Sequence, residues 1–585
     1  MKIINLTLLV CLVFAGNAWG ATYTVCESEC NYDDLSTAIS TEGAATYQIV
    51  EHTFEIPAQV AILDPGVHIV GAYSDTTLTV PVGAAFNMFF VYNTGCTGFR
   101  IEEVDIDLSN FNSGMTSTTG IGIYVHTTPG PTDYSGSIVI DNVGITGGTN
   151  AHKGLYVFHD RDTAETLTAD IDNLSVTGMA NDGALFSEVN TLTIDDSSFT
   201  SNGAAGLNIY YSNATLYNIT ANNNTTHGIS VLHSENWSAD VWEANGNGAW
   251  GFAAGGASVV DYPWNNNFSI TNGSASGNVT GGITLDPADT HYSAGYIYPM
   301  AATVSGNTLV GTAGDIHGIY VSYGSGVTVS GNTASGFDNS GIYVTDGTNT
   351  ITNNTSSGNG LYGLEVSGGA DHSIHDNYFY GNNVISGTGS VRLLAVANTL
   401  TGMDFYNNLI IGPLAIQDFE SGTIANNTMV VGIDTPAMYV DLASDQTGTA
   451  GTSIVNNLFV TDHATGVVRV SNMNRATFEG LTITNNGYWQ SGSETVNIYF
   501  DSDSANNVTE ANFSTWASSH SGDINVDPQL NAAYRSPVAA IYAGGTDLGY
   551  KEDYYGNAQS FPWIGAVGWL WRTEGGQFTG IDFNN

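Results

Sequence analysis

Hydrophobic residues in this chain alternate with polar ones over short stretches, and one short phrase returns many times. The phrase is a glycine followed by an aliphatic, a variable and a second aliphatic residue, and its closest copies lie 22 or 23 residues apart. Alternation with period two predicts β-strands, and these strands are too short and too closely spaced to have helices between them. Clear copies begin at Gly122, Gly154, Gly206, Gly228, Gly282, Gly318, Gly341 and Gly363.

A second phrase keeps step with the first: an aliphatic residue, a variable residue and then asparagine. Asparagine suits a sharp bend, because it tolerates the left-handed backbone conformation and its side-chain amide can bond the backbone. Stacked on itself, asparagine can also form a ladder of amide hydrogen bonds. The phrase predicts one shared turn position for Asn142, Asn173, Asn218, Asn272, Asn307, Asn332, Asn354, Asn377, Asn408, Asn427, Asn457 and Asn486, with Asp196 at the same place in its coil.

A single coil of this length buries almost nothing alone. Coils stacked about 4.8 Å apart bury each inward aliphatic residue against its neighbours and pair the strands in parallel. We therefore expect an all-β solenoid, a parallel β-helix of about 12 or more coils with three short strands per coil. The phrases GIYV, SGNT and ITNN at this period resemble the right-handed parallel β-helix of the pectin-lyase-like superfamily. The resemblance covers roughly residues 47–500 and is specific for fold rather than function.

The two ends of the chain differ from the repetitive body. Residues 1–20 have a basic start, a short apolar stretch and small residues near the end, the pattern of a secretory signal peptide. We expect an N-terminal cap over 21–46, in which Asp33 or Asp34 caps a short helix, then the β-helix over 47–500 and a C-terminal cap segment over 501–585. Both ends resemble those of exported bacterial β-helix proteins. The sequence thus predicts a secreted or cell-surface protein, extracellular or periplasmic, without a membrane span.

Cysteine content and charge add two constraints. Cys26 and Cys30 are expected to form a disulfide, on sequence proximity alone, and the state of Cys96 is left open. The formal net charge of −45 repels phosphate backbones, so nucleic acid is an unsuitable partner. No pattern in the sequence requires a cofactor. Calcium is the one ion that suits acidic loops of this kind, and no pattern identifies residues that would bind it.

Candidate chemistry lies on one predicted sheet. In β-helix enzymes of the superfamily that the chain resembles, ligands generally lie along one sheet, in a groove between inserted loops. The residue between the two aliphatic residues of each glycine phrase, and the residue after the second aliphatic, should point outward on that sheet. Tyrosine recurs there, and aromatic rings beside polar groups commonly hold extended sugars. The simpler interpretation is that tyrosine favours any exposed strand and that the arginines form cross-strand ion pairs. We expect substrate binding by Tyr320, Tyr343, Tyr439 and Tyr499, and catalysis by Glu365, Arg392, Asp441 and Arg469.

Two reaction classes stay open for this groove. Glu365 and Asp441 could act together in glycoside hydrolysis if their carboxyl groups lie about 5 to 9.5 Å apart. A lyase or epimerase acting on uronates would instead use Arg392 or Arg469 near the sugar carboxylate. The catalytic phrases G-H-G and N-T-D of the superfamily's polygalacturonases are absent from the sequence. A denser cluster, His372 and His375 with their neighbouring aspartates, could bind a metal only if a turn brings both rings together.

The sequence therefore favours an exported β-helix protein whose partner is an extracellular polysaccharide. It binds the polysaccharide in a tyrosine-lined groove, and cleavage of lyase or glycoside hydrolase type is left open. The alternative is a non-catalytic surface, adhesive or matrix protein, favoured by the regular body, the acidity and the missing catalytic phrases. Outward charged residues gathered in one cleft would favour the first function, and residues scattered along the body would favour the second.

Overall fold

The chain is described here from a computed structural model. It describes residues 21–112, 115–116, 118–128, 135–160, 166–255, 267–286, 298–299, 301–382, 390–394, 400–417, 419, 421–431, 436–441, 451–461, 466–471, 473, 475–490, 496–501, 504–530, 534, 536, 541, 545, 548 and 564–566. The predicted signal peptide lies outside these residues. The chain divides into two compact units, unit 1 (Met1–Thr225) and unit 2 (Thr226–Asn585).

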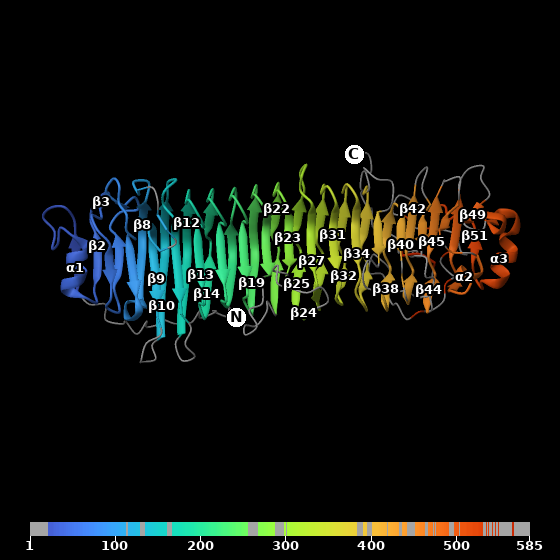
Figure 1. The fold of residues 1–585 in the computed structure, drawn as a ribbon, viewed down its shortest axis with the longest axis horizontal. Helices are drawn as coiled ribbons and strands as arrows, with labels where there is room; N and C mark the ends of the chain where they lie inside the picture. The colour runs from blue at the N-terminus through green and yellow to red at the C-terminus, as the bar shows by residue number, and fades with distance from the viewer. Residues whose placement is uncertain are drawn as a thin grey trace, which may run out of the picture. The chain divides into compact units, whose positions relative to one another are not determined.

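Unit 1 is built from short strands in three parallel stacks, which Figure 1 shows as successive arrows. The first stack contains β1 (Thr22–Val25), β2 (Thr46–Ile49), β5 (His68–Gly71), β8 (Thr97–Asp107), β10 (Ser135–Thr146), β12 (Thr166–Thr177), β14 (Thr191–Asp195) and β17 (Ala214–Thr220). The second contains β3 (Thr53–Glu55), β6 (Thr77–Thr79), β15 (Ser198–Thr200) and the second halves of β8, β10, β12 and β17. The third contains β4 (Val60–Ile62), β7 (Phe89–Tyr92), β9 (Ile121–Thr127), β11 (Lys153–His159), β13 (Ala184–Ser187) and β16 (Leu207–Tyr210).

Unit 2 repeats the same three stacks. Its first stack contains β19 (Trp237–Asn245), β21 (Phe268–Thr271), β25 (Ala302–Ser305), β29 (Thr328–Ser330), β32 (Thr350–Thr352), β35 (Ser373–His375), β38 (Met403–Tyr406), β41 (Gly422–Ala425), β44 (Thr452–Val455) and β47 (Thr482–Thr484). Its second contains the end of β19, then β22 (Ser274–Ser276), β26 (Thr308–Val310), β30 (Thr333–Ser335), β33 (Thr355–Ser357), β36 (Tyr378–Tyr380), β39 (Leu409–Ile411), β42 (Thr428–Val431), β45 (Leu458–Thr461), β48 (Gly487–Gln490) and β51 (Ile524–Asn525).

The third stack of unit 2 carries the residues that the sequence singles out. It contains β18 (Ile229–Leu232), β20 (Trp250–Gly255), β23 (Gly281–Asp286), β27 (His317–Ser322), β31 (Ser340–Thr345), β34 (Tyr362–Ser367), β37 (Val391–Leu394), β40 (Leu414–Gln417), β43 (Met438–Asp441), β46 (Val468–Ser471) and β49 (Val496–Phe500). The short β50 (Val508–Thr509) pairs antiparallel with β49, and β24 (Tyr298–Pro299) pairs with β28 (Gly324–Ser325).

The core follows from the stacking of like residues. One register row in the first stack of unit 2 is apolar on every strand and fully buried: Val304, Val329, Ile351, Ile374, Phe405, Ile424, Ile454 and Ile483. Each strand of three or four residues contributes one or two such side chains, so no coil has a core of its own. Stability therefore comes from neighbouring coils, as in other solenoids.

The asparagines form a buried ladder in unit 2, but the single turn position expected for all of them is wrong. From Asn307 to Asn486, each ladder asparagine donates its backbone N–H and its side-chain amide to the Oδ1 atom of the next one, and Asp523 accepts from Asn486 at the end. The left-handed residue is the one before the ladder position, for example Asn353 at φ 57°. By contrast, Asn142, Asn173, Asn218, Asn272 and Asp196 are themselves left-handed, with φ between 46° and 54°. Their side chains bond at the surface, as Asn272 does to Asp240 at 2.7 Å.

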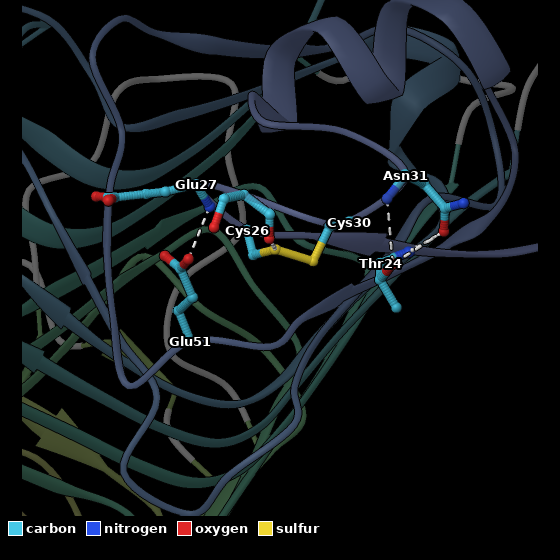
Figure 2. Close-up of a disulfide and its surroundings, with 7 residues drawn as sticks. Thr24, Cys26, Glu27, Cys30, Asn31 and Glu51 are labelled. Atoms are coloured by element: carbon cyan, nitrogen blue, oxygen red, sulfur yellow. Dashed lines mark hydrogen bonds between the residues drawn. A yellow bond between two sulfur atoms is a disulfide. The ribbon is translucent and has the colours of Figure 1, made fainter.

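The N-terminal end of unit 1 is closed by a short helix, as the resemblance implied. Helix α1 (Leu35–Glu42) begins after Asp34, whose carboxylate accepts the N–H of Thr37 at 2.6 Å, and it ends at Gly43, whose φ of 67° suits glycine. The parallel pairing already begins at β1, which lies within the expected cap segment. A disulfide joins Cys26 to Cys30 just after β1, as Figure 2 shows. Cys96 is buried as a free thiol.

The C-terminal part of unit 2 both closes the stack and covers one of its faces. Helices α2 (Arg475–Phe478) and α3 (Phe513–Ser519) lie with the 3-10 turns η2 (Ser504–Asn506) and η3 (Glu510–Asn512) at this end, where Trp516 is fully buried. Further along the chain, Ile541 and Ile564 pack against Leu458, and the N–H of Ala566 bonds the Thr428 hydroxyl at 2.9 Å. These contacts bury Thr428 and Leu458 on the outside of β42 and β45.

Candidate functional site

Seven of the eight tyrosines and charged residues expected at the site share one register row on the third stack of unit 2. Each lies between two buried aliphatic residues of its strand, so its side chain points outward. We call this set the outward row. In order it reads Tyr320, Tyr343, Glu365, Arg392, Ala415, Tyr439, Arg469 and Tyr499. Seven of the eight expected residues lie in this row, and Asp441 lies two residues after Tyr439 on the same strand, at the outward position expected for it.

Glu365 is the most enclosed charged group of the outward row, with a side chain that is 13% exposed. Ser340, on the preceding strand, donates its hydroxyl to one carboxylate oxygen of Glu365 at 3.0 Å. Arg392, on the following strand, lies 3.5 Å from the other oxygen. Burial is the largest influence on Glu365 and raises its pKa, while Ser340 and Arg392 oppose the rise. This carboxyl group therefore holds its proton more readily than an exposed glutamate does.

Arg392 is held by three neighbours and remains partly open to solvent. Besides Glu365, it donates to the hydroxyl of Tyr362 at 3.2 Å and to the amide oxygen of Gln417 at 3.4 Å. Its guanidinium also lies 5.5 Å from the centre of the Tyr362 ring, a cation–π distance. These contacts occupy only some of the five N–H donors of the guanidinium. Since the side chain is 31% exposed, the remaining donors can reach a ligand.

An aromatic group adjoins this ion pair. The rings of Tyr320 and Tyr343 stack with centres 5.3 Å apart, and the His317 ring lies 4.9 Å from that of Tyr343. Burial lowers the pKa of His317 to about 4, so the imidazole is neutral at physiological pH. Burial also raises the pKa of Tyr320 and of Tyr343, so both phenols keep their protons. We call His317, Tyr320, Ser340, Tyr343, Tyr362, Glu365, Arg392 and Gln417 the Glu365 cluster.

A second, smaller group lies further along the outward row. The Arg469 guanidinium stands 5.8 Å from the Tyr439 ring and donates its Nε–H to Asp501 at 3.1 Å. The hydroxyl of Ser471 also donates to Asp501, at 3.1 Å. The hydrogen bond to Asp501 raises the pKa of Arg469 above its already high value. Tyr499 is the register partner of Arg469 on the last strand.

The structure does not bring the four expected catalytic residues together. Glu365 and Arg392 belong to the Glu365 cluster, whereas Arg469 pairs with Asp501 instead of a carboxylate of the first group. Asp441 is three strands from Glu365, which corresponds to about 14 Å at the usual strand spacing. That separation exceeds the range in which two carboxyl groups cooperate in glycoside hydrolysis. The side chain of Asp441 itself lies outside the described residues.

The histidine pair at 372 and 375 does not converge either. His372 is 1% exposed and bonds the backbone, accepting from the Asn349 N–H at 3.3 Å. His375 points the other way, pairs with Asp376 at 2.7 Å and stacks on Tyr406. His372 lies directly before β35 and His375 is the last residue of that strand, so the two rings, three residues apart, point to opposite faces. Among the described residues, no three His, Cys, Asp or Glu side chains lie close enough to hold a metal ion.

Sequence reasoning missed half of the Glu365 cluster. His317, Ser340 and Tyr362 occupy one register position, immediately before the glycine of the phrase. Since that glycine allows the strand to bend, the residue before it turns toward the outward row instead of alternating to the core. The signal is present in the sequence as the pairs H-G, S-G and Y-G at successive repeats.

Comparisons with known proteins bear on the fold. Residues 153–316 match the family model of the right handed beta helix region, and residues 253–411 match that of the periplasmic copper-binding protein NosD. No curated protein matches the chain significantly. The described part of 253–411 contains no three His, Cys, Asp or Glu side chains that converge closely enough to hold a metal ion such as copper.

Several solved structures resemble the chain. The A-module of the mannuronan C-5 epimerase AlgE4 from Azotobacter vinelandii is 17% identical, over 73% of this chain and 88% of that one, with a TM-score of 0.32. The periplasmic alginate epimerase AlgG is 13% identical over 60% and 76%, with a TM-score of 0.34. Tailspike protein 3 of bacteriophage CBA120 is 12% identical over 80% and 64%, with a TM-score of 0.34. Likenesses this distant carry no argument about function.

The fold itself is established by the strand stacks and the matching family model. The chain is a right-handed parallel β-helix protein, which confirms the fold implied by its resemblance to the pectin-lyase-like superfamily. In the described residues, no helix is long and apolar enough to cross a membrane. Function has to be argued from the outward row.

Proposed function

We propose that this chain is an exported protein that binds an extracellular polysaccharide along the outward row of unit 2. The observation that carries the proposal is the Glu365 cluster, in which four adjacent strands present Tyr320, Tyr343, Glu365 and Arg392 at one register position. The strands are about 4.8 Å apart, so the row offers regularly spaced polar and aromatic contacts to an extended chain. A polysaccharide is the ligand whose repeating hydroxyl and ring groups fit such a row.

The charges of the outward row favour a polysaccharide that contains uronic acids. The chain has 10 basic and 55 acidic residues, and two of the basic ones, Arg392 and Arg469, stand on this row. Each is oriented by a carboxylate and keeps an exposed part of its side chain, 31% for Arg392 and 41% for Arg469. A guanidinium binds a carboxylate through paired N–H donors, so a sugar carboxylate is its natural partner.

Cleavage by elimination is a second function of the same cluster, favoured by the position of Glu365. Burial raises the pKa of Glu365 toward neutral pH, and a pKa near the working pH suits a group that both removes and returns a proton. In this reaction Arg392 neutralises the uronate carboxylate, and the Glu365 carboxylate removes the proton on the adjacent carbon. The electron pair forms a carbon–carbon double bond as the glycosidic C–O bond breaks, and Glu365 returns the proton to the leaving oxygen. Hydrolysis by Glu365 and Asp441 is disfavoured by their separation of about 14 Å.

The test is a panel of polygalacturonate, alginate and neutral glucans, with and without calcium. Binding is measured by calorimetry, and reaction is followed by new reducing ends and by the ultraviolet absorbance of unsaturated products. We expect binding of at least one polyuronate that weakens about tenfold or more in Arg392→Gln, since a charge-assisted contact contributes about 1.5–3 kcal/mol. Arg392→Lys should recover part of the loss. Tyr380→Ala, an exposed tyrosine on β36, is the control and should bind like the wild type.

The outcomes separate the functions. Unsaturated products that disappear in Glu365→Gln, with binding kept, establish elimination. Binding without products leaves a polysaccharide-binding protein. Reducing ends without unsaturated products contradict elimination, and the absence of binding to every member of the panel contradicts the proposal and favours a structural or adhesive protein.

A further inference from the structure

We infer that unit 1 carries a separate saccharide-binding site, which takes an uncharged polysaccharide. The site lies on the third stack of unit 1 and shares no residue with the Glu365 cluster. It does not rest on the proposed function, because the two sites differ in residues and in the charge of the sugar that suits them. The evidence is an aromatic surface, the lack of an available charge on its described strands and an unpartnered side-chain oxygen at its edge.

The aromatic surface spans three adjacent strands, β7, β9 and β11. Each strand presents two outward rings, two residues apart, and the register aligns them into two rows. We call this set the aromatic strip: Phe90, Tyr92, Tyr124, His126, Tyr156 and Phe158. Tyr124 is 7% exposed, and the other five are partly exposed. A continuous group of large rings on the outside of an exported acidic protein marks a binding surface.

The rings of the aromatic strip pack on one another along and across the strands. Tyr124 is parallel within 7° to His126, which follows it along the strand, and within 12° to Tyr156, which lies across from it on the next strand. The ring centres are 5.5 Å and 5.0 Å apart. Tyr124 itself is 7% exposed, so the surface available to the apolar face of a pyranose comes from the partly exposed rings around it.

Charge selects an uncharged ligand at this strip. The strands β7, β9, β11, β13 and β16 contain one lysine or arginine, Lys153, and no aspartate or glutamate. Lys153 is 4% exposed and is paired with the buried Asp182 at 3.5 Å. Burial also lowers the pKa of His126, so that ring is neutral at physiological pH. Among the described residues of these strands no cation is available, and the net charge of the chain is −45, so an anionic sugar chain is repelled and a neutral one is not.

A polar edge completes the site. Two strands beyond Tyr156, on β16, Asn208 occupies the same register row, and Tyr210 occupies the row of Phe158. The Asn208 amide donates to the Tyr210 hydroxyl at 3.5 Å, while its buried Oδ1 atom has no hydrogen-bond partner. A buried carbonyl oxygen without a donor is costly, and a sugar hydroxyl reaching this edge would supply the donor. Two strand spacings, about 10 Å, separate the rings from this amide, so the ligand spans more than one sugar unit.

The test uses the full chain and neutral hexasaccharides of cellulose, laminarin, mannan and xylan, with hexagalacturonate as the anionic probe. We expect calorimetry to detect at least one neutral hexasaccharide, with an affinity that changes less than about twofold as salt is raised, because no ion pair is formed. Tyr156→Ala with Phe158→Ala should weaken this binding at least about tenfold, and Asn208→Ala about fivefold. Tyr217→Ala removes an exposed tyrosine of unit 1 outside the strip and serves as the matched control.

Arg392→Gln separates this inference from the proposed function. It should leave binding of the neutral hexasaccharide unchanged, whatever it does to polyuronates. The inference is overturned if every neutral hexasaccharide fails to bind the wild type, or if binding persists in the double variant. It is also overturned if the double variant, folded by circular dichroism, converts a dimer into a monomer, since the strip would then contact a second copy of the chain.

Discussion

At the scale of single residues, the ladder position shows how one side chain links three coils. The Oδ1 atom of Asn354 accepts both the backbone N–H and the amide of Asn332, each at 3.0 Å. Its own amide donates to Val329 at 2.9 Å and to Asn377 at 3.0 Å. The residue is 1% exposed, so no solvent replaces these bonds. This position therefore demands asparagine for its hydrogen bonds rather than for its backbone conformation.

Asn354→Ala should destabilise unit 2 by about 3 kcal/mol, because it leaves buried groups of Asn332 and Val329 without partners. The measurement is the free energy of unfolding in urea. Asn353→Gly is the matched control, since Asn353 is exposed, has a left-handed φ of 57° and is well replaced by glycine. Equal destabilisation in both variants would show that the ladder bonds contribute nothing particular.

Asp523 ends the ladder with a carboxyl group instead of an amide. Its oxygens accept from the backbone of Asn486 at 2.8 Å and from the Trp516 indole at 2.9 Å. Burial is the largest influence and raises the pKa of Asp523 to about 6. Because the folded state binds this proton more readily than the unfolded state, stability present at low pH is lost as the pH rises through the folded pKa.

Unit 2 should therefore gain about 1.4 kcal/mol of stability from Asp523 when the pH falls from about 8 to about 5. The measurement compares the pH slope of the unfolding free energy in the wild type and in Asp523→Asn, which has no proton to gain. The variant should show the smaller slope. An identical slope in the two proteins would contradict the assignment of this pH dependence to Asp523.

At the scale of elements, parallel stacking forces like residues together, whether this is favourable or not. In unit 1, Glu102, Asp141, Asp172 and Asp195 occupy one register row on four adjacent strands. Arg100 pairs with Glu102 and lies 3.5 Å from Asp141, so it compensates one end of the row. Burial first, and the charge of Asp172 second, raise the pKa of Asp141 and of Asp195. This acidic row thus costs stability at neutral pH that it regains as the pH falls.

Asp172→Asn should stabilise unit 1 by about 0.5–1 kcal/mol at low salt, because it removes the central repulsive charge. The gain should shrink in about 1 M NaCl, where exposed charges are screened. Thermal unfolding at both salt concentrations measures it, with Glu55→Gln on the exposed β3 as the control. A gain that is equal at both concentrations would mean that the effect is not electrostatic.

The repeat predicted the elements and the register well, because a period-two phrase with a fixed glycine leaves one way to bury its aliphatic residues. Tyr320, Tyr343, Glu365 and Arg392 accordingly stand where the phrase placed them. The asparagine phrase was less informative, since two neighbouring turn positions both accept asparagine for different reasons. The residues before the glycine were missed because a bend there breaks the alternation on which the prediction depended.

At the scale of the whole molecule, charge distinguishes the two proposed sites. With 55 acidic and 10 basic residues, a cation facing outward is uncommon in this sequence. The outward row of unit 2 carries two arginines, and the aromatic strip of unit 1 offers no available one among its described strands. The account therefore predicts two sugar preferences within one chain, acidic in unit 2 and neutral in unit 1.

The most direct test of the central claim is hydroxyl-radical footprinting of the full chain with and without a bound polyuronate. Oxidation of Tyr320, Tyr343 and Tyr439 should fall when the polyuronate is present, while that of Tyr380 on β36 stays unchanged. We expect this protection to disappear in Arg392→Gln at the same polyuronate concentration. Two results would contradict the placement of the site on the outward row. One is that a bound polyuronate leaves the oxidation of the outward-row tyrosines unchanged, and the other is that it protects Tyr380 instead.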